Sequence, residues 1–189
     1  MGRPGSLTAA GQHRPEVTLR PATEDDARLL LDLRNDPDAV RFSGGRTGVT
    51  PAEHREWLST RLADPSTHLW IAEQAGDAVG QVRVDVQDGS GTVSLAIAPS
   101  HRGRGIGSAV LSAMVYEMEH AGDAHTLRAM AHVENTASIR AFVRAGFHRR
   151  ALREGEFAIL ERTIGREGGT GHNQVDIDLR VSRYPGGTR

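Results

Sequence analysis

The strongest constraint on this chain is the glycine-rich segment RGRGIGS at residues 102–108, which separates a strand pattern from a helix pattern. Before it, Val93, Leu95 and Ile97 alternate with small residues, as they do on a strand with one apolar face. After it, residues 106–121 carry apolar side chains three and four positions apart, which predicts a helix. The order is therefore strand, glycine-rich turn, helix.

This turn is suited to binding a phosphate or a diphosphate. The first backbone N–H groups of a helix have no partner within the helix, and the helix dipole adds partial positive charge at the same place. Gly103, Gly105 and Gly107 have no Cβ, so the backbone can approach an anion closely. A tight strand-to-helix turn that binds no ligand is the simpler alternative.

The spacing of the glycines excludes two common phosphate-binding motifs. The P-loop motif GxxxxGK[ST] requires a lysine, and no lysine follows any glycine here. The dinucleotide motif GxGxxG fails because Ser108 and Val110 stand where its third glycine is required. The pattern that fits is [QR]-x-x-G-x-[GA], with Arg102, Gly105 and Gly107 at its fixed positions.

This pattern resembles the acetyl-CoA motif of the GNAT superfamily of N-acetyltransferases. A second segment, NTASIRAFVRAGF at residues 135–147, resembles the superfamily's N-x-x-[AS]-I-x-x-[YF]-x-x-x-G-F segment at every anchor. The two landmarks occur in the expected order, and the resemblance covers Val17 to about Val181. It implies an enzyme that uses acetyl-CoA and no metal.

Periodicity along the rest of the chain predicts an α+β domain. Strands are expected at 16–20, 68–74, 79–87, 92–98 and 126–132, from residue 147, and at 175–181; helices are expected within 23–34, 50–62, 106–121 and 135–145. Hairpins and helical crossovers both occur in this order, which indicates a mixed sheet. The GNAT resemblance implies the same architecture, with a mostly antiparallel sheet flanked by about four helices.

The second of these helices has a clear start signal. Thr50 and Glu53 form a capping-box pattern, and Trp57, Leu58 and Leu62 are expected to face inward.

Composition limits the class of protein. The 189 residues carry 23 basic and 24 acidic side chains, a balance that argues against nucleic-acid or membrane-surface binding. There is no cysteine, so disulfides, thiolate catalysis and cysteine metal sites are excluded. No apolar run is long enough to span a membrane and no signal-peptide core occurs, so a cytoplasmic protein is expected.

A single domain is expected at residues 16–183. Residues 1–15 are rich in Gly, Pro, Ser and Ala without periodicity and are interpreted as a disordered leader, and residues 184–189 as a flexible tail. Gly2 and Ser6 fit the minimal N-myristoylation pattern, although chance matches to so short a pattern are common.

The GNAT resemblance implies where the coenzyme binds. The glycine turn would hold the diphosphate, the backbone of Ile97 and Pro99 would align the pantetheine arm, and Asn135 would contact that arm from the other side. A strand N–H near Leu95 or Ala96 would polarise the thioester carbonyl. The expected cofactor-binding residues are Leu95, Ala96, Ile97, Ala98, Pro99, Arg102, Gly103, Arg104, Gly105, Ile106, Gly107, Ser108, Asn135, Ser138 and Phe142.

Acetyl transfer also needs a neutral amine. An alkylammonium has a pKa near ~10.4, so only one molecule in ~10³ is neutral at pH 7, and a carboxylate or imidazole normally accepts the proton. The candidates for this base are Glu73, Asp85, His132 and Glu134, and each of them also has a purely structural explanation.

The departing thiolate is a separate question. Many GNAT enzymes protonate it with a tyrosine, but Phe142 holds that position here, so no tyrosine acid is expected. Water can protonate the thiolate, because a thiol pKa near ~8.5 makes it a fair leaving group.

The acceptor pocket of GNAT proteins is built mainly between the first two strands, here residues 33–61, with a flexible loop expected at 41–49. Together with residues 69–73 and 79–83, this segment resembles the N-acetyltransferases that act on nucleotide-linked 4-amino-6-deoxy sugars, as in pseudaminic acid synthesis. The candidate acceptor-binding residues are Arg41, Arg46, His54 and Trp57. The two arginines could meet the phosphates of a sugar nucleotide.

Other acceptors stay open: a protein N-terminus or lysine, a polyamine, or an aminoglycoside. A strongly acidic pocket would favour the polycations, whereas residues 33–61 mix arginines with acids. A non-catalytic acyl-CoA sensor with the same fold is the alternative of another class. A homodimer and an acyl group longer than acetyl are also left open.

Overall fold

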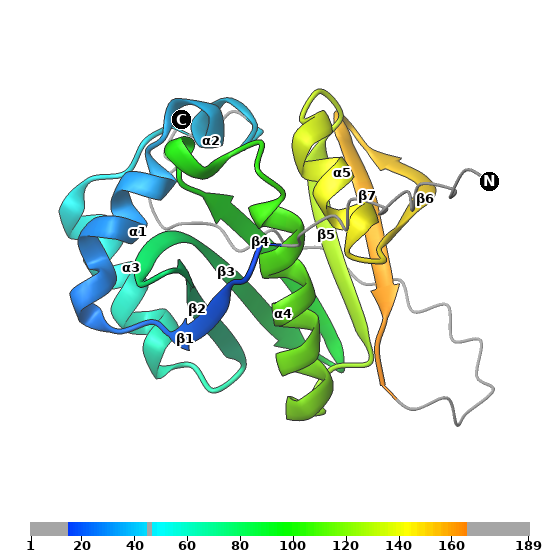
Figure 1. The fold of residues 1–189 in the computed structure, drawn as a ribbon, viewed down its shortest axis with the longest axis horizontal. Helices are drawn as coiled ribbons and strands as arrows, with labels where there is room; N and C mark the ends of the chain where they lie inside the picture. The colour runs from blue at the N-terminus through cyan, green and yellow to red at the C-terminus, as the bar shows by residue number, and fades with distance from the viewer. Residues whose placement is uncertain (1–14, 45–46, 166–189) are drawn as a thin grey trace, which may run out of the picture.

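The computed structural model describes residues 15–44 and 47–165, which form an α+β domain around one seven-stranded sheet (Figure 1). The strand order is β1-β2-β3-β4-β5-β7-β6. The strands are β1 (Thr18–Pro21), β2 (Thr67–Gln74), β3 (Asp77–Gln87), β4 (Ser90–Ile97), β5 (Thr126–His132), β6 (His148–Glu154) and β7 (Phe157–Thr163). All neighbours are antiparallel except β4 and β5, which confirms the predicted mixed, mostly antiparallel sheet.

Helices cover both faces of this sheet. They are α1 (Ala27–Arg34), α2 (Pro37–Arg41), α3 (Pro51–Ala63), α4 (Ile106–Ala121) and α5 (Thr136–Arg144), with 3-10 turns at Glu24–Asp26 and Pro99–His101. One apolar core forms between α4 and the face of β3 that carries Val82 and Val84. A second core forms where α1 and α3 meet Leu69 and Ile71 of β2. None of the helices in the described residues combines the length and apolar character needed to cross a membrane.

Local sequence signals set the helix starts. At α3 the Thr50 hydroxyl accepts a hydrogen bond from the Glu53 N–H, and the Glu53 carboxylate accepts one from the Thr50 N–H, which confirms the capping box. At α5 the Asn135 side chain accepts a hydrogen bond from the Ser138 N–H. Asn135 is thereby held in one orientation at the start of its helix.

Two details of the helices correct the sequence interpretation. The segment after α1 forms a fifth helix, α2, because the Asp36 carboxylate accepts a hydrogen bond from the Ala39 N–H and Pro37 suits the first helical position. Leu62 is 36% exposed and does not face inward, whereas Leu58 is fully buried as expected.

The C-terminal part of the sheet begins close to residue 147, as expected, and includes a strand, β7, that the sequence did not predict. A hairpin of β6 and β7 follows α5, and β7 inserts between β5 and β6 in the sheet. The further strand predicted at 175–181, residues 1–14 of the predicted leader and the predicted tail at 184–189 lie outside the described residues.

The feature that positions the site is a split in the sheet. The parallel strands β4 and β5 pair only through Ser90–Thr92 and Thr126–Arg128, and beyond these residues they diverge (Figure 1). The two facing strand edges therefore carry backbone N–H and C=O groups with no neighbouring strand, and such groups bind extended ligands.

Candidate functional site

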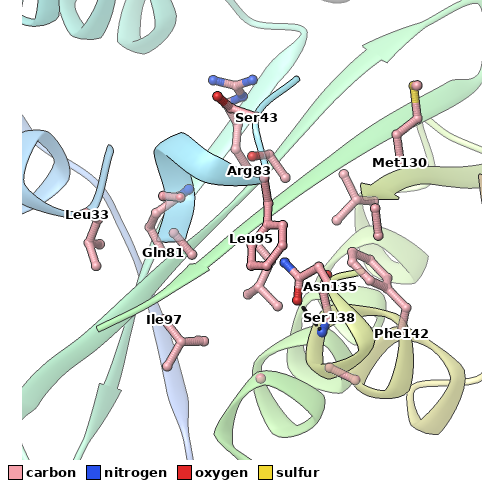
Figure 2. A pocket seen from close by; sticks show the side chains of 18 of the residues that line it. Leu33, Ser43, Gln81, Arg83, Leu95, Ile97, Met130, Asn135, Ser138 and Phe142 are labelled. Atoms are coloured by element: carbon pink, nitrogen blue, oxygen red, sulfur yellow. Dashed lines mark hydrogen bonds between the residues drawn. The ribbon is translucent and has the colours of Figure 1, made fainter. Parts of the chain in front are cut away.

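A cleft of about 1300 Å³ lies where β4 and β5 diverge. Its lining comes from both halves of the sheet, from the turn before α4, and from helices α1, α2, α3 and α5. Figure 2 shows Leu95 and Ile97 of β4 on one side, and Met130, Asn135 and Phe142 on the other.

The register of β3 and β4 decides which backbone groups of β4 face this cleft. The Ala98 N–H donates to the Val79 C=O at 2.9 Å, and in an antiparallel ladder every second residue bonds to the same neighbour. Ala96 therefore also turns its N–H toward β3, whereas Leu95 and Ile97 turn theirs toward the diverging β5. Of the two N–H groups considered for polarising a carbonyl, the geometry favours that of Leu95.

The turn before α4 presents backbone N–H groups to the same cleft. Gly103 and Gly105 have φ angles of 76° and 79°, the left-handed region that glycine adopts without strain, and Gly105 is the N-cap of α4. Within the described part of the chain, no side chain hydrogen-bonds to the start of this helix. The first-turn N–H groups are therefore oriented to bind an anion.

Arg102 holds this turn in place. Its guanidinium pairs with Asp36 at 2.5 Å and with Asp38 at 2.9 Å, and its Nε donates to the Ile97 C=O at 2.9 Å. The side chain thus connects the glycine turn to α2 and to the end of β4. This arrangement leaves anion binding at the turn to the backbone.

Most of the residues predicted to bind the coenzyme line the cleft: Leu95, Ala96, Ile97, Arg102, Gly103, Gly105, Ile106, Gly107, Ser108, Asn135, Ser138 and Phe142. Ala98, Pro99 and Arg104 belong to the same segments but do not line it. Tyr116 is 58% exposed on α4 and does not line it either, and Tyr184 lies outside the described residues.

A cleft of this kind occurs in a known protein family that the chain matches. The family model described as "Acetyltransferase (GNAT) domain" matches residues 16–148, which is most of the chain. The chain belongs to the GNAT acetyltransferase family. This GNAT protein is therefore an acetyl-CoA-dependent N-acetyltransferase.

Solved structures share the fold. The aminoglycoside acetyltransferase AAC(6')-Ib in complex with coenzyme A is 23% identical with a TM-score of 0.67, over 78% of this chain and 95% of that one. Spermidine N-acetyltransferase from Vibrio cholerae, in complex with CoA and spermine, is 18% identical with a TM-score of 0.70, over the same shares. A search of the curated proteins found no significant match. At these identities the likeness shows the fold and leaves the acceptor undecided.

Two of the four candidate bases of this GNAT enzyme lie away from the cleft lining. The Glu73 carboxylate is 2.7 Å from the Nε of Arg20, whose guanidinium also pairs with Asp26. Glu134 is 62% exposed and pairs with Arg41 at 3.3 Å. Both carboxylates therefore pair with arginines outside the cleft lining.

The other two candidates, Asp85 and His132, line the cleft. His132 Nδ1 accepts a hydrogen bond from the Glu134 N–H at 3.2 Å, so its proton is on Nε2, 3.2 Å from the Glu156 carboxylate. Both ring nitrogens of His132 are therefore occupied.

The Asp85 carboxylate can still accept a further hydrogen bond. One carboxylate oxygen is 3.0 Å from the Nε of Arg83. The other accepts a hydrogen bond from the Thr67 hydroxyl at 3.0 Å and lies 3.8 Å from the guanidinium of Arg61. A carboxylate has about four lone-pair sites, so Asp85 can accept a further proton donor.

Two of the four residues predicted to bind the acceptor line the cleft. His54 and Trp57 both line it, with ring centroids 5.3 Å apart, and His54 is almost fully buried. Burial and the nearby charge of Arg34 lower the pKa of His54, so its imidazole is neutral at pH 7. Arg41 does not line the cleft, and Arg46 lies outside the described residues.

Arginine dominates the charge of the lining, which the sequence analysis did not foresee. The charged residues that line the cleft are Arg34, Arg61, Arg83, Arg102, Arg140 and Arg144, with Asp38 and Asp85. Six cations against two anions leave an excess of four positive charges, although the whole chain has a net charge of −1. The available signal was the alternation of Gln81, Arg83 and Asp85 with valines along β3.

Proposed function

We propose that this enzyme acetylates the primary amine of a small molecule that also carries negative charge, and that the acceptor is a nucleotide-linked amino sugar. The observation that carries the proposal is that Arg34, Arg61 and Arg83 line one part of the cleft with a single lining carboxylate, Asp85. Asp64, which pairs with Arg61 at 3.8 Å, does not line the cleft. Guanidinium groups match the geometry of phosphate oxygens and bind them bidentately. The resemblance of residues 33–61 to amino-sugar N-acetyltransferases supports the same acceptor.

A polycationic acceptor fits poorly beside Arg34, Arg61 and Arg83. The two named neighbours are an aminoglycoside acetyltransferase and a spermidine N-acetyltransferase, whose acceptors carry several amino groups. Ammonium groups brought beside an excess of arginine in a partly dehydrated cleft would be repelled. A neutral His54 does not change that balance.

The reaction is a direct transfer. The diphosphate of acetyl-CoA binds the turn at 103–108 and its pantetheine arm lies along the free edge of β4. The neutral amine attacks the thioester carbonyl carbon, and the Leu95 N–H stabilises the resulting oxyanion. The amine proton passes through water to Asp85 and the C–S bond breaks. The thiolate takes a proton from water, and Asp85 returns its proton to the hydroxide that this leaves. The products are the N-acetylated amine and CoA.

The proposal is tested by thiol release from acetyl-CoA with a panel of amines: UDP- and TDP-linked 4-amino sugars, the free amino sugars, kanamycin, spermidine and a peptide with a free N-terminus. We expect kcat/KM for a nucleotide sugar to exceed that for the free sugar and for both polycations by at least about tenfold, since each phosphate contact adds roughly 1.5–3 kcal/mol. A preference for kanamycin or spermidine would refute it. If the protein binds acetyl-CoA but releases no CoA thiol with any of the amines, the sensor alternative is favoured.

Two variants test whether the arginines of the cleft cause the preference for a nucleotide sugar. Because Arg83 also pairs with Asp85, the free amino sugar is the reference: Arg83→Gln should lower kcat/KM more for the nucleotide sugar than for the free sugar, while leaving the KM for acetyl-CoA unchanged. Arg55→Gln removes the same charge from an exposed position of α3 that does not line the cleft, and should change neither.

A further inference from the structure

The coenzyme end of the cleft carries two arginines that the reaction above does not use. Arg140 and Arg144 lie one turn apart on α5, and both line the cleft. Neither makes a hydrogen bond or an ion pair with another described residue. Arg102, in contrast, is fully paired with Asp36 and Asp38.

Helix stability does not explain these two side chains. Like charges four residues apart on a helix repel each other. A cation in the last turn, such as Arg144, complements the helix dipole, but Arg140 lies too far from the C-terminal end to gain in this way. Both side chains are exposed, so neither supports the core.

Helix α5 contacts the glycine turn through Ala141, next to the exposed face that carries the two arginines. A Cβ at Gly107 would be 3.5 Å from the Cβ of Ala141, the residue that follows Arg140. Both arginines lie to one side of this contact, and they line the same cleft as Gly103, Gly105 and Gly107.

We propose that Arg140 and Arg144 form the binding subsite for the 3′-phosphate of coenzyme A. The inference rests on the assignment of the coenzyme to the turn at 103–108. In CoA the 3′-phosphate and the 5′-diphosphate are attached to the same ribose, so the 3′-phosphate lies one sugar away from that turn. A phosphate monoester carries close to two negative charges at neutral pH, which two guanidinium groups match.

This subsite makes the enzyme selective for the complete coenzyme. Acetyl-CoA would be preferred over acetyl-dephospho-CoA, which lacks only the 3′-phosphate, and over acetyl-pantetheine. Because both arginines are exposed, the preference would weaken as salt is raised.

The test is calorimetric binding of CoA and of 3′-dephospho-CoA to the wild-type chain and to an Arg140→Gln, Arg144→Gln double variant. The wild type should bind CoA at least tenfold more tightly than dephospho-CoA. The double variant should lose most of this difference, while its affinity for dephospho-CoA stays within about twofold of the wild type. An Arg55→Gln, Arg149→Gln variant is the charge-matched control, since both arginines are exposed and neither lines the cleft; it should keep the wild-type preference.

Two results would overturn the subsite. One is equal binding of the two ligands by the wild type; the other is an equal loss of affinity for both ligands in the double variant, which would place the arginines at the diphosphate or in the fold. The assay needs no acceptor, so its failure is distinct from failure of the acceptor proposal. A wild type that binds neither ligand would instead overturn the coenzyme site itself.

Discussion

Alanine at two glycines of the turn should change stability in opposite directions. Gly105 has a φ of 79°, and a residue with a Cβ pays roughly 1–2 kcal/mol for that conformation. The nearest atoms to its Cβ would be those of Pro15 at 3.8 Å, so the cost is backbone strain and not a clash. Gly107 is helical, and alanine there gains about 0.5–1 kcal/mol from the smaller loss of backbone entropy.

Packing does not reverse the effect at Gly107. A Cβ there would lie 3.5 Å from Ala141, 3.6 Å from Leu95 and 3.8 Å from Ile97, which are ordinary contacts. For a domain of this size, 1 kcal/mol moves Tm by roughly 2–4 °C. Gly105→Ala should therefore lower Tm by about 2–8 °C, and Gly107→Ala should raise it by about 1–4 °C.

Thermal unfolding without ligand and calorimetry with CoA check both halves of the argument. Gly105→Ala should also weaken CoA binding, because the N-cap conformation orients the first-turn N–H groups. Gly107→Phe should abolish CoA binding and leave the fold intact, since its ring would extend from the turn into the cleft beside Leu95. Shifts of the same sign for the two alanine variants, or unchanged CoA affinity in Gly107→Phe, would refute the reasoning.

Three further predictions concern single residues. Asp85→Asn should lower kcat by about 10²–10⁴-fold with little change in the KM for acetyl-CoA; an unchanged kcat would exclude Asp85 as the base. The folded-state pKa of His54 is below its ordinary 6.5, so below about pH 6.5 the unfolded chain binds more protons than the folded chain. The folded state therefore loses stability as pH falls below that value. Urea titrations should show that the free energy of unfolding depends less on pH in His54→Phe than in the wild type. Phe142→Tyr should keep kcat within a few-fold of the wild type, and a loss beyond about a hundredfold would mean that the buried ring contacts the substrate closely.

Sequence reasoning was most successful where a few neighbouring residues set the structure. The glycine turn, the capping box at Thr50 and the cap of α5 by Asn135 all form as predicted. It was least successful in the segment after α1, where α2 forms, and at the β6–β7 hairpin. A five-residue helix is too short to show periodicity, and the pairing of β7 with both β5 and β6 joins residues far apart in the chain.

The candidate site divides in the same way. The coenzyme half is built from two continuous segments, so its residues could be recognised from their spacing. The proposed acceptor half is assembled from side chains of several helices and strands. Neither the arginine excess nor the pairing of Glu73 with Arg20 could therefore be predicted from the sequence.

The sequence by itself determined that a strand, a glycine turn and a helix occur together, because dihedral preferences and unpaired N–H groups depend on residues a few positions apart. Only the tertiary structure decided that Leu95 and not Ala96 turns its N–H to the cleft, and that six arginines converge on it. Strand register and the packing of helices on a sheet depend on contacts between distant residues, and these exist only once the chain has folded.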